Sequence, residues 1–170
     1  MKGFSEGLFV ICILCILLCV NGCTTSYKSC INERTNQTII RWGDYVIADG
    51  TFHGYEYRAQ DLGVYTVQKQ PQHKEIQYQK IDTVQAQVFC MSLNTIIDTF
   101  SEIQSLYSPG TIGRSIEYIN QKTMITKKAI WNPLFQTYGS KEFRAIYDSL
   151  MQTVSVKNRW PDTIIHETVK

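Results

Sequence analysis

The residues that could carry nucleophilic or metal chemistry are few and lie far apart in the chain. The histidines His53, His73 and His166 have no second histidine or cysteine at the spacing of metal ligands, and no HExxH motif occurs. Ser115 follows Gly113-Arg114, but the glycine that would complete a nucleophile elbow is missing. We therefore expect no catalytic residue, no metal site and no cofactor.

The amino-terminal segment has the composition of an export signal. Lys2 precedes an apolar run from Leu8 to Val20, and Glu6 only partly offsets the positive start. This run is shorter than the roughly 20 residues of a membrane-spanning helix. Its length matches the roughly 7–15 apolar residues at the centre of a signal peptide. The sequence therefore predicts a signal peptide over residues 1–22.

The residues at the end of this run follow a recognisable order. Val20 stands three positions before Cys23, and the small residue Gly22 stands directly before it. This order resembles the lipobox of bacterial prolipoproteins, although Asn21 departs from the usual Ala, Ser or Thr. The resemblance implies cleavage before Cys23 and a thioether-linked diacylglycerol on its sulfur. Because Thr24 rather than Asp follows, it implies the outer membrane rather than the inner. An ordinary signal peptide, with Cys23 unmodified, is the alternative.

Three of the 6 cysteines lie in the signal segment, which leaves Cys23, Cys30 and Cys90. An odd number is unusual in an oxidising compartment, and lipid on Cys23 would leave Cys30 and Cys90 as the one pair that could form a disulfide. Cys30 lies in a polar segment, 23–38, that reads as a tether. A disulfide needs Cα atoms within about 7 Å, and nothing in this tether compels it to fold back. A reduced, buried Cys90 is the expected state, and the disulfide is the alternative.

The strands and helices that would position a functional site are expected to begin after the tether. Short apolar or alternating segments, separated by turn residues, predict an antiparallel meander. Gly43-Asp44 is expected to break the first of them. A hairpin around residues 120–122 follows later in the chain. The expected strands are 39–42, 45–48, 54–58, 64–67 and 74–81, with 115–119 and 123–131 in the hairpin.

Two segments have the three-four spacing of amphipathic helices. The first has its apolar face at residues 89–106 and a start near Asp82 or Thr83. The second is expected to be capped by Ser140, with Phe143 to Val154 on its apolar face. The expected class is α+β, an antiparallel meander plus a hairpin with two helices packed on one face. The domain would span residues 39–154, with a carboxy-terminal tail over 155–170.

Aromatic residues concentrate in the predicted sheet, and most are expected in the core beneath the helices. In the alternative arrangement some of them lie on the open face beside Arg41 and Arg58. Trp42, Tyr55 and Tyr57 are the candidates for such ligand-facing positions. Amphipathic rings of this kind suit a sugar or peptide ligand.

The charge balance excludes one class of partner and leaves others open. With 17 basic and 15 acidic residues the net charge is +2, which gives no argument for nucleic acid. We expect a lipid-anchored, non-catalytic binding or interaction module whose partner is an envelope protein or a glycan. A hydrolase with a dispersed site and a peptidase-inhibitor-like protein are the alternatives. The order of elements is similar to that of small lipoproteins of Bacteroidetes-type bacteria and of small peptidase inhibitors, a likeness that carries over no residues.

The lipid anchor is testable by one substitution. Cys23→Ala removes the sulfur that would carry the acyl chains, each buried CH₂ of which contributes about 0.8 kcal/mol to membrane binding. We expect this variant to leave the membrane fraction and to remain unprocessed, whereas Cys19→Ala keeps its membrane partition. Cell fractionation measures the membrane partition of the two variants, and mass measurement of the native protein measures its processing. Unchanged membrane partition of Cys23→Ala would contradict lipidation.

Overall fold

The computed structural model describes residues 30–71, 75–103, 106 and 111–160. The predicted signal peptide, Cys23 and residues 161–170 of the predicted tail lie outside the described residues, as do His73 and His166. Within the described part of the chain, no helix is long and apolar enough to span a bilayer.

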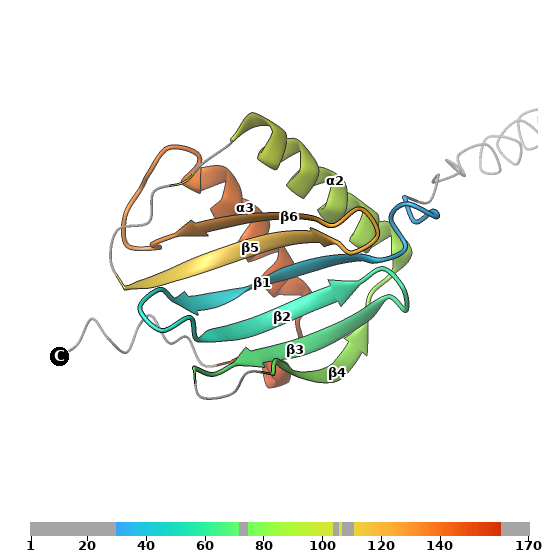
Figure 1. The fold of residues 1–170 in the computed structure, drawn as a ribbon, viewed down its shortest axis with the longest axis horizontal. Helices are drawn as coiled ribbons and strands as arrows, with labels where there is room; N and C mark the ends of the chain where they lie inside the picture. Colours follow the sequence, from blue (N-terminus) through green and yellow to red (C-terminus); the bar gives the residue numbers. More distant parts are fainter. Residues whose placement is uncertain (1–29, 72–74, 104–105, 107–110, 161–170) are drawn as a thin grey trace, which may run out of the picture.

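The described residues form one sheet of six antiparallel strands (Figure 1). The strand order is β4-β3-β2-β1-β5-β6, so the first four strands follow one another and the last two return beside β1. Every neighbouring pair is antiparallel. The bounds are Thr38–Val46 for β1, Phe52–Arg58 for β2, Gly63–Lys69 for β3, Gln77–Thr83 for β4, Ile112–Asn120 for β5 and Ile125–Trp131 for β6.

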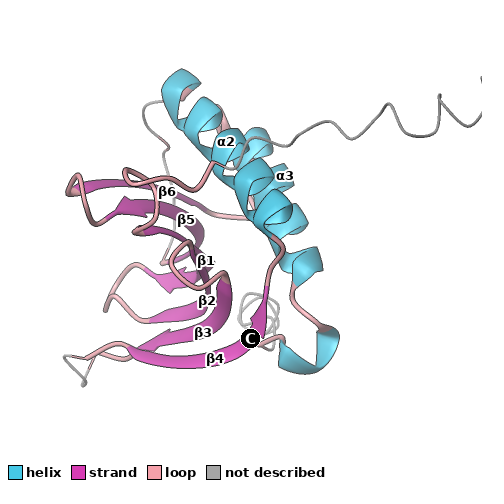
Figure 2. Ribbon diagram, turned by 90° about the vertical axis from the view of Figure 1, so that its right-hand side faces the viewer, coloured by secondary structure: helices cyan, strands magenta, loops and turns pink. Residues whose placement is uncertain are grey.

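Two helices cover one face of this sheet (Figure 2). Among the described residues no helix covers the other face, which is called the open face below. Helix α2, Ala86–Glu102, connects β4 to β5, and helix α3, Ser140–Thr153, follows β6. A short 3-10 turn, η1, occupies Val156–Asn158. The predicted class, α+β with an antiparallel sheet and two helices, is confirmed.

The core between sheet and helices is rich in aromatic rings. Trp42, Tyr55 and Tyr57 are at most 2% exposed and lie in the same apolar cluster as the buried faces of α2 and α3. The ring of Trp42 lies 4.7 Å from that of Tyr57 and 5.8 Å from that of Tyr55. Tyr57 also contacts Phe89 of α2. These three rings lie in the core, where most of the aromatic residues were expected, and the alternative in which Trp42, Tyr55 and Tyr57 face a ligand is wrong. Strand alternation turns all three toward the helices.

Strand β1 is continuous through Gly43, where a break was predicted. Gly43 pairs with Gly54 of β2, and the ring of Phe52 lies against both glycines. A Cβ on Gly43 would lie 2.3 Å from the carbonyl oxygen of His53 and 2.9 Å from the Phe52 ring. Glycine is needed here for the close approach of the backbones, and the same residue that resembles a turn signal serves a strand.

The segment predicted as a tether is partly folded into the domain. Cys30 and Cys90 form a disulfide with Cα atoms 5.5 Å apart, which contradicts the expectation of a reduced Cys90. Cys90 lies in the first turns of α2. The turns that lead from Cys30 to Thr38 bring the two cysteines together: the Thr35 hydroxyl donates to the Cys30 carbonyl, and the Thr35 carbonyl accepts from the Thr38 N–H.

Residues 155–160, predicted as part of a tail, also pack on the domain. The Tyr55 hydroxyl donates to the carbonyl of Asn158 at 3.1 Å and accepts from the backbone N–H of Trp160 at 2.5 Å. The Trp160 ring stacks on His53 of β2, with centroids 5.5 Å apart. His53, which lies outside the expected strand 54–58, is thus a residue of β2, and its ring packs against Trp160. The domain therefore includes Cys30 at one end of the described residues and Trp160 at the other.

Candidate functional site

A row of charged and tyrosine side chains crosses the open face of the sheet. It joins neighbouring strands in register, and its charges alternate over the first four positions. Residues that pair directly across antiparallel strands share a face and contact one another. The row runs through Lys128, Glu117, Arg41, Glu56, Tyr65 and Lys80, one from each strand.

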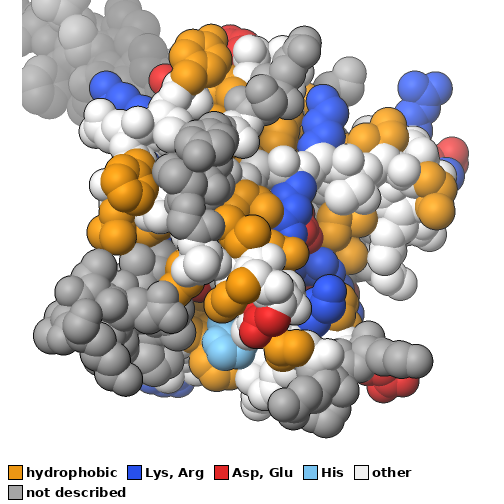
Figure 3. Space-filling model, turned by 60° about the vertical axis from the view of Figure 1, so that its left-hand side comes forward, with side chains coloured by type: hydrophobic (Ala, Val, Ile, Leu, Met, Phe, Trp, Pro, Cys, Tyr) orange, Lys and Arg blue, Asp and Glu red, His pale blue; other side chains and the backbone are white. Residues whose placement is uncertain are grey.

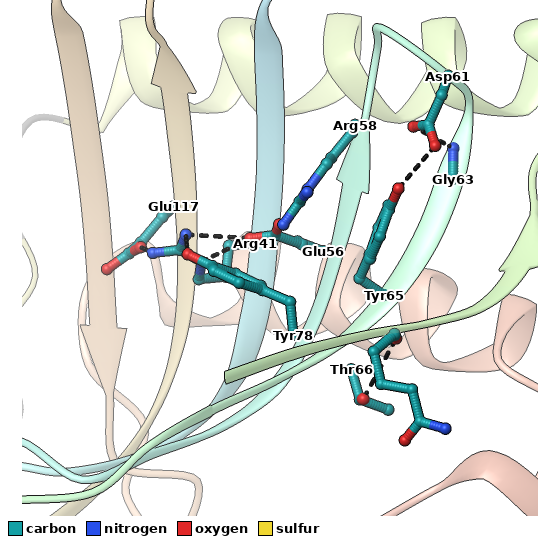
Figure 4. Close-up of polar contacts among 10 residues, drawn as sticks. Arg41, Glu56, Arg58, Asp61, Gly63, Tyr65, Thr66, Tyr78 and Glu117 are labelled. Atoms are coloured by element: carbon teal, nitrogen blue, oxygen red, sulfur yellow. Dashed lines mark hydrogen bonds and ion pairs between the residues drawn. The ribbon is translucent and has the colours of Figure 1, made fainter. Parts of the chain in front are cut away.

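The carboxylate of Glu56 lies at the centre of this row and is fully buried, with 0% of its side chain exposed. One oxygen accepts from Arg41 Nε at 3.0 Å, and the other accepts from Arg58 Nε at 2.6 Å (Figure 4). A buried carboxylate is tolerated only where opposite charge and hydrogen bonds replace water. Arg41 and Arg58 supply both, although Glu56 lies on the uncovered face.

Arg41 connects this centre to the next strands. Its guanidinium also donates to Glu117 at 3.2 Å and to the Tyr78 hydroxyl at 3.4 Å. Burial alone would lower the pKa of Arg41, but the charges of Glu56 and Glu117 outweigh it and raise that pKa. Arg41 is therefore a fixed positive charge with few remaining conformations.

Aromatic rings complete the row on both sides. The Arg58 guanidinium lies 4.0 Å from the centre of the Tyr65 ring and 4.6 Å from that of Tyr78. Toward the other edge, Lys128 pairs with Glu117 at 2.6 Å and lies 3.9 Å from the Tyr45 ring. Such cation–π contacts are worth about 0.5–2 kcal/mol each and limit the motion of long basic side chains.

Asp61 fixes the corner of the row beside β3 and β4. Its carboxylate accepts from Lys80 Nζ at 2.6 Å, from the Tyr65 hydroxyl at 2.6 Å and from the Gly63 N–H at 3.0 Å. Slight burial would raise the pKa of Asp61, but the hydrogen bonds and the charge of Lys80 lower it from 3.8 to about 2. Asp61 therefore stays ionised over the whole physiological range.

A hollow of about 350 Å³ opens beside Arg41, Arg58 and Tyr78. It lies at the amino end of β1 and at the ends of the strands that flank it. Amide, guanidinium and phenol groups dominate its wall, and none of the described residues that line it is acidic. The lining also includes Asn36, Gln37, Thr38, Ile39, Gln60, Ile119 and Gln121.

The sequence indicated only part of this site. Arg41 and Arg58 were expected on the open face, but Glu56, Glu117 and Tyr78 were not recognised as their partners. The pattern that could have indicated Glu56 is the strict alternation at residues 55–58. In a strand this alternation places Glu56 on the face opposite to its tyrosine neighbours. Of the proposed site residues, Cys30 and Cys90 meet, and Cys23 lies outside the described residues. Among the residues that the structure describes, no three His, Cys, Asp or Glu side chains gather as metal ligands.

Comparison with models of known protein families and with curated proteins gives no match.

The ion pair and hydrogen bonds of Asp61 predict a specific acid response. A carboxylate whose pKa is lower in the folded state stabilises the fold above its unfolded pKa near 3.8, and this contribution is lost as the pH falls through about 2. We expect Asp61→Asn to reduce the loss of unfolding free energy between pH 5 and pH 2, and Tyr65→Phe to reduce it less. Urea unfolding across this range measures the slopes. Identical slopes for wild type and Asp61→Asn would show that these contacts contribute nothing.

Proposed function

We propose that this chain is a lipid-anchored protein of the bacterial cell envelope that binds a glycan on the open face of its sheet, without catalysis. The observation that carries the binding site is the hollow lined by Arg41 and Arg58, which the buried Glu56 holds in place. The lipobox-like order of Val20, Gly22 and Cys23 supports the anchor.

The groups around the hollow define the class of ligand. The amides of Gln37, Gln60 and Gln121 can each donate and accept hydrogen bonds, as sugar hydroxyls require. The Arg41 guanidinium is already held by Glu56, Glu117 and Tyr78. Of the two arginines, Arg58 is therefore the one that would receive a carboxylate of the ligand. A carboxylate-bearing glycan, such as the strands of the cell wall, meets both conditions.

The carboxylates of the row favour binding over hydrolysis. A glycosidase needs one acid that can give a proton and one carboxylate that faces the substrate. Both oxygens of Glu56 are taken by arginines, and Glu117 is paired with Arg41 and Lys128. Both carboxylates are occupied by basic side chains, which suits the organisation of a binding site.

The position of the hollow agrees with an anchored binder. Thr38, at its wall, begins β1, and the disulfide holds Cys30 close to the same end of the domain. From Cys23 to Cys30 the chain can span at most about 25 Å. The hollow would therefore stay near the membrane that carries the lipid, within reach of cell-wall strands.

Co-sedimentation with purified cell-wall sacculi tests this function. The processed protein in detergent should sediment with sacculi and release no soluble sugar fragments. The double variant Gln60→Ala/Gln121→Ala removes two hydrogen-bonding side chains, and at about 1 kcal/mol each it should weaken binding at least tenfold. Met91→Ala, an exposed change on α2, is the matched control and should bind as wild type does. Equal binding by the double variant, or no sedimentation of wild type, would exclude the hollow as a glycan site.

A further inference from the structure

The loop between β6 and α3, residues 132–139, presents large apolar side chains to solvent. Leu134 is 60% exposed, Phe135 52% and Tyr138 83%. Figure 3 shows exposed hydrophobic side chains on this side of the molecule. The loop has the sequence NPLFQTYG and contains no charged residue. Contiguous exposed apolar groups of this kind mark interaction sites more often than single exposed residues do.

The backbone of the first half of this loop is fixed by one arginine. The guanidinium of Arg144, on α3, donates to the carbonyl oxygens of Asn132 at 3.0 Å, of Pro133 at 2.8 Å and of Phe135. The side chain of Asn132 accepts from the N–H of Leu134 at 2.9 Å. Three carbonyls held by one planar cation leave this segment few alternative conformations.

The second half is fixed by Ser140, which the sequence had assigned to capping the helix. Its hydroxyl instead donates to the carbonyl of Thr137 at 2.8 Å and accepts from the N–H of the same residue at 3.0 Å. Gly139 takes the capping position with φ +73°, and a Cβ there would lie 2.7 Å from Ile103. Hydrogen bonds thus fix the backbone of the loop, and its large apolar side chains stay exposed to solvent.

We infer that the β6–α3 loop is a docking element that inserts Leu134, Phe135 and Tyr138 into an apolar pocket of a second envelope protein. Aromatic and aliphatic side chains on a fixed backbone are the usual anchors of protein interfaces. Because the loop is already ordered, association loses little conformational entropy. This surface is separate from the hollow on the open face.

The position of the loop favours a protein over the anchoring bilayer as its binding partner. This inference rests on the proposed lipid anchor. Strand β6 ends at Trp131, which pairs with Arg114, and Arg114 pairs with Asp44. Asp44 is six residues beyond Thr38, about 20 Å along β1, so the loop lies at the end of the sheet opposite to the tether. Lipid-binding segments also carry basic residues, whereas this loop has none.

Site-specific photo-cross-linking in cells of the source bacterium tests the docking element. A benzophenone amino acid replaces Phe135 or Tyr138 in the full-length chain. Met124, which is 86% exposed in the β5–β6 hairpin, is the control position. We expect one discrete adduct with another protein from both loop positions and none from Met124. Leu134→Asp should reduce its yield at least tenfold while the melting temperature of the purified protein stays within a degree or two.

The remaining outcomes overturn the inference. An adduct between two copies of this chain would show self-association, and adducts with lipid alone, or none, would exclude a protein pocket. If the cross-linked adduct forms with equal yield from Met124, or if Leu134→Asp does not lower its yield, the contact is non-specific and the loop is not a docking element. Gln60→Ala/Gln121→Ala should leave the yield of the adduct unchanged. The experiment therefore distinguishes a failure of the proposed glycan site from a failure of the proposed docking loop.

Discussion

The burial of the Glu56 carboxylate constrains both faces of the sheet. Glu56 lies between Tyr55 and Tyr57 in β2, and those two rings fill the core under the helices. A slip of one residue in the register would put the carboxylate among aromatic rings and the rings in water. The observed register is acceptable because Arg41 and Arg58 neutralise the carboxylate on the other side. The pairing of β1 with β2 therefore serves the core and the open face at once.

The same ion pairs give the open face its fixed shape. Arginine side chains normally lose about 2 kcal/mol of rotamer entropy when they bind a ligand. In this protein Arg41 and Arg58 are already held by Glu56, and Tyr78 lies against both (Figure 4). On our proposal a glycan would meet a preorganised hollow near the tethered end, while the β6–α3 loop would reach a protein at the opposite end. The domain would then connect the cell wall to a membrane-distant partner.

Much of the fold follows from patterns that are local in sequence. The alternation of residues 54–58 and the three-four spacing of both helices predict the layers correctly. What failed depends on contacts between distant segments. Gly43 looks like a break until its partner Gly54 and the ring of Phe52 are known. Cys30 lies far from Cys90 in sequence, and only the folding of residues 30–38 brings them together.

The site was harder to predict for the same reason. The row on the open face takes one residue from each of six strands, so no short motif contains it. Ser140 shows the limit of a local rule: its residue type fits a helix cap, but the conformation of Gly139 leaves its hydroxyl to close the preceding loop.

The most direct test of this account is a double-mutant cycle on Glu56 and Arg41, measured as unfolding free energies in urea. Glu56→Gln should destabilise the fold by about 3 kcal/mol, because Arg58 loses its carboxylate partner and Arg41 keeps only Glu117. Arg41→Met should also destabilise it, and the double variant should lose at least about 1 kcal/mol less than the two single losses together. Losses that add within about 0.5 kcal/mol would show that the Arg41–Glu56 pair does not organise the sheet.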